Sequence, residues 1–336
     1  MKKKTETTVC EILLEKACIA KISDNRGLYY AYNTVINFLR DNALDIPLKQ
    51  IDVKWASGVY RVMKSKGLNA STIRIYFQKI QFAFNVAKYK KLTKADDFIK
   101  RNSFEIDRLE LPKSKVGTRR DFNLTKEQMT ELYNICLERP TSASDLKRKR
   151  KIALFVAMYL CNGCNLADLL RLTVPTKRNL NEGVITFVRH KTERKCNTSV
   201  KIPITEPLKN IFGVLGKDIY KMPAGSLIFD YLVGLKSESE ISGKIGSVLV
   251  NLNYHLKRVG EKMNLDFVLS CGAARKSFCS VLNAQAVPYS YIERAMQHSL
   301  KITDFYLGEF PIEKCFEWNS LLLDLPTNDN QLLNVC

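Results

Sequence analysis

Residues 269–310 read LSCGAARKSFCSVLNAQAVPYSYIERAMQHSLKITDFYLGEF, and this stretch decides the fold of the second half of the chain. It contains Arg275, then His298 and Tyr306 further along. Apolar residues recur between them at spacings typical of amphipathic helices, and Pro288 separates two such helices. We therefore expect the arginine on one buried helix, the histidine at the end of the next, and the tyrosine on a short segment that folds back.

These three side chains suit one kind of reaction. A tyrosine phenol has an ordinary pKa of about 10, so it is a poor nucleophile near neutral pH. It attacks a phosphodiester only if cations neutralise the non-bridging oxygens and hold the phosphorus in line. An arginine grips two phosphate oxygens at once, and a histidine donates a hydrogen bond or assists proton transfer. The set therefore favours chemistry on a phosphodiester.

The order of three short motifs carries a family resemblance. RKSF begins at Arg275, MQHS begins at Met296, and YL begins at Tyr306. Together they resemble the C-terminal signature of the tyrosine recombinases, the phage-integrase family, over residues 9–310. The resemblance implies a mainly α fold with a small antiparallel sheet, in which a helical N-terminal domain precedes an integrase-type catalytic domain. It also implies site-specific DNA recombination by an integrase of a mobile element, through a 3′-phosphotyrosine intermediate.

The charge of the chain fits a nucleic-acid partner. Lysine and arginine number 53 against 34 acidic residues, which gives a net charge of +19 over 336 residues. Such an excess favours a polyanion, and DNA phosphate is the commonest one. Ribosomal, RNA-binding and membrane-surface proteins are the other basic classes. Nothing in the sequence resembles the aromatic motif of an RRM or the glycine loop of a KH domain, so an RNA module fits worst.

The ten cysteines and the N-terminus indicate a reducing compartment. Charged residues interrupt the N-terminal region that a signal peptide would need, and the longest apolar run, 152–161, is half of a membrane span. We expect a cytoplasmic protein, at the bacterial nucleoid, with no membrane partner. Cys161 and Cys164 form a single CxxC, which we interpret as buried small residues at a helix end rather than a zinc site.

The first part of the chain is expected to be helical throughout, with helices near 9–22, 26–43, 52–66 and 70–91. Basic residues interleave with aromatic ones there, and most single lysines of this kind lie on a solvated helix face. As a set they resemble the core-binding domain that clamps DNA in integrases. We expect the helix at 70–91 to lie against the duplex. The residues expected to contact DNA are Arg74, Lys79, Lys88 and, in the second domain, Lys276.

Composition changes along the chain give the expected domains. A helical, SAM-like core-binding domain takes residues 1–100, and a basic linker that crosses the DNA takes residues 101–121. The catalytic domain takes residues 122–310. The C-terminal segment 311–336 is expected to hold a helix and a tail.

Two positions depart from the family pattern. Asn165 stands where the family has the first of two arginines that bind the scissile phosphate, and Gly272 stands where it commonly has a histidine. An asparagine is a good helix N-cap, with Asp168 in the first turn, but it is no cation. These departures keep a second interpretation open, namely a catalytically degenerate, sequence-specific DNA-binding protein of the same fold.

Residues 183–204 are expected to form a β-hairpin. Lys191 matches the family's hairpin lysine, which protonates the leaving 5′ oxygen. Side chains alternate along a strand, so Arg189 is expected on the same face as Lys191. We hypothesise that Arg189 supplies the phosphate-binding cation that is missing at Asn165. A simple contact between Arg189 and the DNA backbone is an equally weighted alternative.

The resemblance also implies partners. These are double-stranded attachment sites, a tetramer on synapsed DNA formed through the C-terminal segment, and accessory DNA-bending factors. The covalent intermediate stores the bond energy, so we expect no cofactor, neither ATP nor metal. A type I topoisomerase uses similar tyrosine chemistry without needing a specific site, and this class stays open as well.

Overall fold

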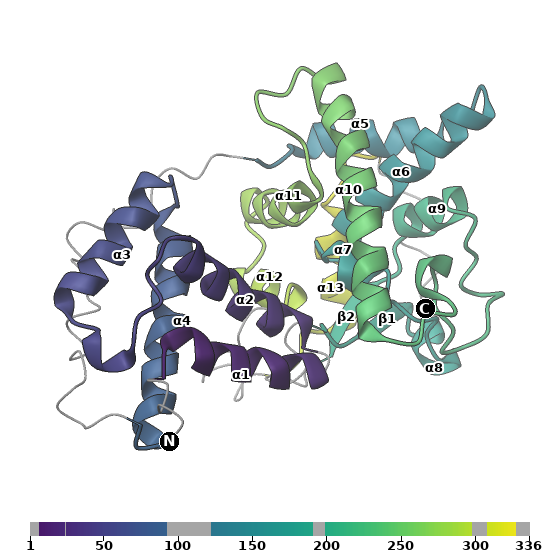
Figure 1. Cartoon of the computed structure of the whole chain (residues 1–336). Coiled ribbons are helices and arrows are strands. Elements are labelled where there is room, and N and C mark those ends of the chain that lie inside the picture. Colours follow the sequence, from purple (N-terminus) through teal and green to yellow (C-terminus); the bar gives the residue numbers. More distant parts are fainter. Residues whose placement is uncertain (1–6, 24, 93–121, 191–198, 298–307, 327–336) are drawn as a thin grey trace. The chain divides into compact units, whose positions relative to one another are not determined.

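The computed structural model describes residues 7–23, 25–92, 122–190, 199–297 and 308–326. The chain forms two compact units, Met1–Arg120 and Asp121–Cys336 (Figure 1). The residues expected to form the linker, 101–121, lie outside the described ranges.

The first unit contains helices with one shared core. They are α1 (Val9–Ile22), α2 (Arg26–Asp41), α3 (Val53–Ser65) and α4 (Ala70–Tyr89), with a 3-10 turn at Leu48–Gln50. Each begins at a polar N-cap whose side chain accepts a backbone N–H bond: Thr8, Asn25, Asp52 and Asn69. The apolar stripe of α4 faces the core, with Ile80 and Phe84 almost fully buried. The four expected helices are therefore present.

The second unit is also mainly helical. Its helices are α5 (Lys126–Leu137), α6 (Ala143–Leu160), α7 (Leu166–Leu169), α8 (Lys177–Asn181), α9 (Glu206–Val214), α10 (Glu238–Lys262), α11 (Cys271–Ala284), α12 (Tyr289–Ala295) and α13 (Ile312–Ser320), with a 3-10 turn, η4, at Asp230–Leu232. Among the described residues, one two-stranded antiparallel sheet joins β1 (Val184–Phe187) to β2 (Val200–Pro203), with Val184 opposite Pro203 and Phe187 opposite Val200. The expected fold class, mainly α with a small antiparallel sheet, is confirmed.

Helix α6 lies at the centre of the second unit. Every residue from 152 to 161 is buried, because α5, α9, α10 and α11 all pack around this part of the helix. The basic run at 147–151 precedes this part on the same helix, which begins at Ala143. Asn162 and Gly163 then take left-handed conformations, with φ of +55° and +60°, and end the helix.

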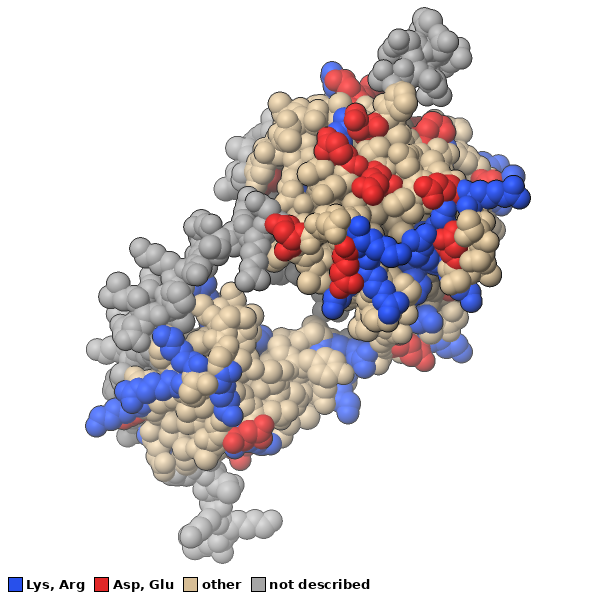
Figure 2. Space-filling view, turned by 90° about the horizontal axis from the view of Figure 1, so that it is seen from above, with Lys and Arg blue, Asp and Glu red and all other residues tan. Residues whose placement is uncertain are grey.

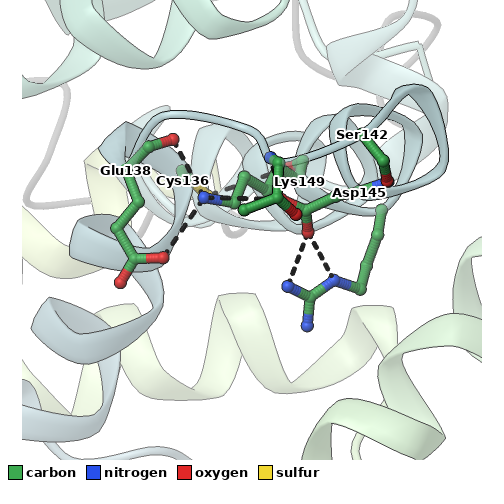
Figure 3. Close-up of polar contacts among 7 residues, drawn as sticks. Cys136, Glu138, Ser142, Asp145 and Lys149 are labelled. Carbon is green, nitrogen blue, oxygen red and sulfur yellow. Dashed lines mark hydrogen bonds and ion pairs between the residues drawn. The ribbon is translucent and has the colours of Figure 1, made fainter.

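A buried lysine ties α5 to α6 (Figure 3). Lys149 is 2% exposed, and its Nζ donates to the backbone oxygen of Glu138 at 2.9 Å and to Glu138 Oε2 at 3.2 Å. Asp145 Oδ2 lies 3.8 Å from the same nitrogen. The ammonium is thus buried with carboxylates beside it, as a buried charge requires.

This arrangement makes Lys149 a stability determinant. We expect Lys149→Ala to lower the free energy of unfolding of the second unit by about 2–4 kcal/mol, because it removes buried methylenes and the bonds to Glu138. Lys149→Met keeps the volume and is expected to cost about 1 kcal/mol. Hydrogen exchange of the α6 amides in the full chain measures both. Lys147→Ala, at an exposed position of the same helix, is the control. Equal losses for the alanine and methionine variants would contradict this role.

The C-terminal helix α13 packs within its own chain. Trp318 stacks on Tyr291 of α12 with ring centroids 4.5 Å apart, and Asn319 bonds the Tyr291 hydroxyl. Beyond the helix, Leu322 is 1% exposed and its carbonyl accepts a bond from Tyr159 of α6 at 2.6 Å. The segment 311–325 therefore belongs to the core of the second unit.

Candidate active site

Arg275 lies one turn into α11, which begins after Ser270. The same helix buries Ala274 and Phe278 against the unit core. Gly163, at the end of α6, approaches α11 closely: a Cβ there would lie 2.9 Å from Phe278 Cβ and 3.1 Å from Arg275 Cα. Only glycine fits this approach and tolerates the φ of +60°. The loop after α6 therefore packs directly against the backbone of α11 at Arg275.

The guanidinium of Arg275 bridges two segments. Its Nη1 donates to the carbonyl of Gly163 at 3.1 Å, and its Nη2 donates to the carbonyl of Met296 at 2.7 Å. Met296 directly follows α12, so α6, α11 and α12 all meet at this side chain. An arginine has five N–H donors, and these two bonds leave donors for an anion.

Arg189 converges on the same place. It lies just beyond the end of β1, and its backbone N–H donates to Gln297 Oε1 at 2.8 Å. Its Nε is 3.4 Å from Asp168 Oδ2, with the two side chains 12% and 5% exposed. Burial first, and then the nearby charge of Arg189, lowers the pKa of Arg275. Arg275 and Arg189 thus bond consecutive residues, Met296 and Gln297, in a largely buried setting.

Asp168 organises this side of the site. Its carboxylate pairs with Arg189 and also accepts a bond from the backbone N–H of His190 at 3.3 Å. His190 Nε2 lies 3.6 Å from Glu238 at the start of α10. The sequence analysis assigned Asp168 only a favourable place in the first helical turn. Its contacts to the hairpin arise from tertiary structure, and helix capping patterns give no signal for them.

Asn165 occupies the N-cap position of α7, as expected, but its side chain makes no capping hydrogen bond. The predicted position of the cap is therefore confirmed, whereas the hydrogen bond that a capping side chain would make is absent at Asn165. The side chain is half-buried and lies two residues from Gly163, whose carbonyl binds Arg275. Asn165 is consequently close in sequence to the contact that holds the arginine, although it carries no charge itself.

Gln297 is a site residue that the sequence analysis missed. It is 5% exposed and left-handed, with φ of +49°. That conformation costs a non-glycine residue about 1–2 kcal/mol. Its side-chain oxygen accepts the Arg189 backbone bond, so it joins the hairpin to the turn after α12. The left-handed backbone at a non-glycine residue depends on tertiary contacts, so the local sequence gives no clear signal for it.

Three of the expected catalytic residues, Lys191, His298 and Tyr306, lie outside the described residues. Described residues flank both ends of the segment 298–307. Gln297 binds Arg189, and at the other end the carbonyl of Gly308 accepts a bond from Arg294 Nη1 at 2.7 Å. The two ends of the segment with the expected histidine and tyrosine are therefore fixed near α12.

Gly272 is exposed on the first turn of α11. A Cβ at this position would approach only Ser270 Oγ, at 3.9 Å. There is room for a larger side chain, so packing does not explain why glycine stands here.

The residues expected to bind DNA lie on two units. On α4, Arg74 and Lys88 are exposed, and at about 100° per residue they share one face, whereas Lys79 is turned about 140° from Arg74. Lys79 is half-buried, with its ammonium 4.9 Å from the centre of the Tyr32 ring. On α11, Lys276 is exposed over the Phe122 ring at 4.2 Å. A single DNA-facing side of α4 would include Arg74 and Lys88 but not Lys79.

Among the described residues, no three His, Cys, Asp or Glu side chains are grouped so that they could hold a metal ion. No helix in these ranges has the length and apolar character to cross a membrane. Cys161 and Cys164 are both buried, as expected for small residues at a helix end.

Comparison with known proteins supports the fold. Residues 11–104 match the phage integrase SAM-like domain. The integrase of transposon Tn1549, in complex with a circular-intermediate DNA, is similar with a TM-score of 0.60 and 17% identity, over 96% of each chain. A lambda integrase tetramer bound to a Holliday junction is similar with a TM-score of 0.57 and 15% identity, over 93% of this chain and 82% of that one.

No curated protein sequence matches the chain. Over residues 11–104 the chain matches the phage integrase SAM-like domain, and over nearly its whole length its fold is similar to the folds of the Tn1549 and lambda integrases.

Proposed function

We propose that the protein is a site-specific DNA recombinase of the tyrosine type, an integrase of a mobile element. The Tyr306 phenol gives its proton to His298, and its oxygen attacks a backbone phosphorus and forms a 3′-phosphotyrosyl bond. The bond from phosphorus to the 5′ oxygen breaks, and Lys191 gives that oxygen a proton. A 5′-hydroxyl from a second strand then attacks the phosphotyrosine and releases the tyrosine, so each strand is rejoined without ATP.

The convergence of Arg275 and Arg189 is the observation that carries this proposal. Two guanidiniums that lie close enough to lower a pKa repel each other, and burial strengthens that repulsion. Asp168 offsets one of the charges. A phosphodiester between the two arginines would neutralise the other, and it would gain further in the transition state, when negative charge builds up on the non-bridging oxygens.

The same pair supports the substitution of Arg189 for the cation missing at Asn165. Arg189 is anchored through its backbone to Gln297 and through its side chain to Asp168, so its guanidinium is positioned before substrate binds. Gln297 immediately precedes His298 in the chain. The hairpin arginine and the segment of the expected histidine are thereby joined by one hydrogen bond.

The decisive experiment captures the covalent intermediate. The protein is incubated with a nicked duplex that carries the joined ends of its element, and the products are separated in SDS. A complex that resists SDS and is absent with Tyr306→Phe supports the proposal. DNA binding of normal affinity without any covalent complex would establish the second function instead, a catalytically silent DNA-binding protein, which the residues Asn165 and Gly272 favour.

The open position at Gly272 gives a gain-of-function prediction. Gly272→His restores the side chain that the family commonly has here, and no neighbour prevents it. We expect the rate of covalent-complex formation to rise about tenfold, which is less than the roughly 100- to 10,000-fold that a fully positioned proton donor provides. Gly272→Ala, which adds bulk without an imidazole, is the matched control. A histidine variant that behaves like the alanine variant would show that no acid or base is missing here.

Partners follow from the proposed reaction. The substrate is a double-stranded attachment site at the bacterial nucleoid, synapsed by a tetramer, with DNA-bending factors as assistants. The C-terminal segment is the proposed contact between subunits. Because α13 packs on α12 and β2 of its own chain, it would have to leave these contacts, or extend beyond them through its last residues, to reach a neighbour.

A further inference from the structure

A basic cleft lies between α6 and α10, away from the two arginines of the candidate active site. Its volume is about 670 Å³. The cleft is lined by six cationic side chains: Lys147, Arg148, Arg150, Lys151, Arg258 and Lys262. Figure 2 shows a contiguous group of Lys and Arg side chains on the second unit, bordered by Asp and Glu.

The charges in this cleft are poorly balanced. No acidic residue is among those that line it. Within the described residues, Arg148 is the one cation of the six with an ion pair to a carboxylate, at 2.7 Å from Asp145 Oδ1. Lys151 bonds the Asn251 side chain, and Arg258 lies over the Tyr254 ring at 4.4 Å, which are neutral partners. The remaining positive charge favours an anion in the cleft.

The environment of His255 agrees with this reading. His255 also lines the cleft, beside Lys151 and Arg258. Burial lowers its pKa, and the charges of these two neighbours lower it further. The contribution of these two cations to the lowered pKa indicates a positive electrostatic potential at His255.

The position of the cleft relates it to the candidate active site. Arg148, which lines the cleft, and Leu160, the last residue of α6 before the turn at Gly163, are twelve residues apart, about 18 Å along the helix axis. Helix α10 runs in the opposite direction between the same two places, because Glu238 at its start contacts Arg171 and His190, while Lys262 at its end lines the cleft. At 3.4 Å per base pair, 18 Å corresponds to about five base pairs of duplex.

We infer that the cleft between α6 and α10 binds the phosphate backbone of the duplex about five base pairs from the cleaved phosphate. This inference rests on the proposed function for the identity of the duplex. It assigns a role to the cations of the run 147–151 other than the buried Lys149: they would bind phosphates rather than only face the solvent. Such contacts position DNA without reading its sequence.

The test is the salt dependence of DNA binding, which needs no knowledge of the attachment site. The triple variant Lys147→Ser, Arg150→Ser, Lys262→Ser removes three cleft charges that have no ion pair among the described residues. The control variant Lys209→Ser, Lys221→Ser, Lys314→Ser removes the same charge from lysines that each pair with a neighbouring acid. Fluorescence anisotropy with a duplex of about 30 bp gives the affinity over a series of salt concentrations.

Each lost phosphate contact lowers the slope of log K against log salt by about 0.9, so we expect the cleft variant to lose about 2–3 in slope. The control variant should lose less than about 1. Equal slopes for the cleft variant and the wild type would overturn the inference. A melting temperature of the wild-type protein that rises when polyglutamate is added, but not when DNA is added, would overturn it as well. Folding is checked by the melting temperature, which removal of like charges should leave unchanged or raise.

A second measurement separates this inference from the proposed function. On the nicked substrate, flanks that end about three or about ten base pairs from the cleaved phosphate are compared. On the substrate with the longer flank, the cleft variant should have a lower affinity than the wild type. On the substrate with the shorter flank, the two affinities should be equal. Absence of any covalent complex would refute the recombinase while leaving the slopes interpretable. A normal complex with unchanged slopes would refute only the cleft.

Discussion

Replacing Arg189 by alanine is expected to slow covalent-complex formation by about 100- to 1000-fold. The guanidinium lies beside Arg275 and is held by Asp168 and Gln297, so its loss removes one preorganised cation from the proposed transition state. The measurement is a single-turnover time course with the nicked duplex, quenched in SDS. DNA affinity should fall far less, because a single phosphate contact is a small part of total binding.

A matched control and a rescue sharpen this experiment. Arg178→Ala removes an arginine that is 87% exposed on α8 and pairs with Glu182, and its rate should stay at the wild-type level. Asn165→Arg introduced into the Arg189→Ala protein restores a cation at the family position and should recover at least tenfold. Wild-type cleavage by Arg189→Ala would exclude the compensation. Failure of the rescue, with the slow Arg189→Ala rate retained, would show that the two positions do not exchange roles.

Among substitutions that add a single methyl group to the second unit, we expect Gly163→Ala to lower the free energy of unfolding the most. It forces an alanine to a φ of +60° and places a Cβ 2.9 Å from Phe278 Cβ. We expect a loss of about 2–4 kcal/mol, from backbone strain and overpacking together. For a unit of this size, the melting temperature should fall by about 5–15 °C. The carbonyl of Gly163 would also move from Arg275, so residual folded protein should cleave slowly.

Gly213→Ala provides the comparison. Gly213 lies in α9, and an added Cβ there meets nothing within 4 Å. Alanine is a better helix former than glycine, so this variant should be about 0.5–1 kcal/mol more stable than the wild type. Thermal unfolding of both variants in the full chain is sufficient. A Gly163→Ala protein as stable as the wild type would mean that α11 does not approach the loop as closely as described.

Helix positions were predictable because their causes are local. The four helices of the first unit have apolar residues at three- and four-residue steps, and the structure places each within two residues of the expected bounds. Thr125 and Gln128 form a reciprocal capping pair at the start of α5, at the three-residue spacing that is typical of such pairs. Caps and periodicity are properties of a few consecutive residues, so one sequence suffices to find them.

The site was predictable only in part. The two strands of the hairpin were predicted correctly, but strand alternation is a poor guide to Arg189, because β1 ends at Phe187 and the arginine follows it. What places Arg189 is Asp168 and Gln297, which are far from it in sequence. Such contacts depend on how α7, α12 and the hairpin pack, and no local pattern encodes that. The positions of Lys191, His298 and Tyr306 stay predictions.

The bond between Arg294 and Gly308 has a consequence for how far the nucleophile can travel. Tyr306 is two residues from Gly308, so a fully stretched chain allows about 7 Å between their Cα atoms. Gly308 is tied to α12, and the next residue, Glu309, is tied to β2 through Lys201 at 2.6 Å. We therefore expect the proposed nucleophile to stay within reach of the chain that also holds Arg275, and we predict that each subunit cleaves DNA with its own tyrosine.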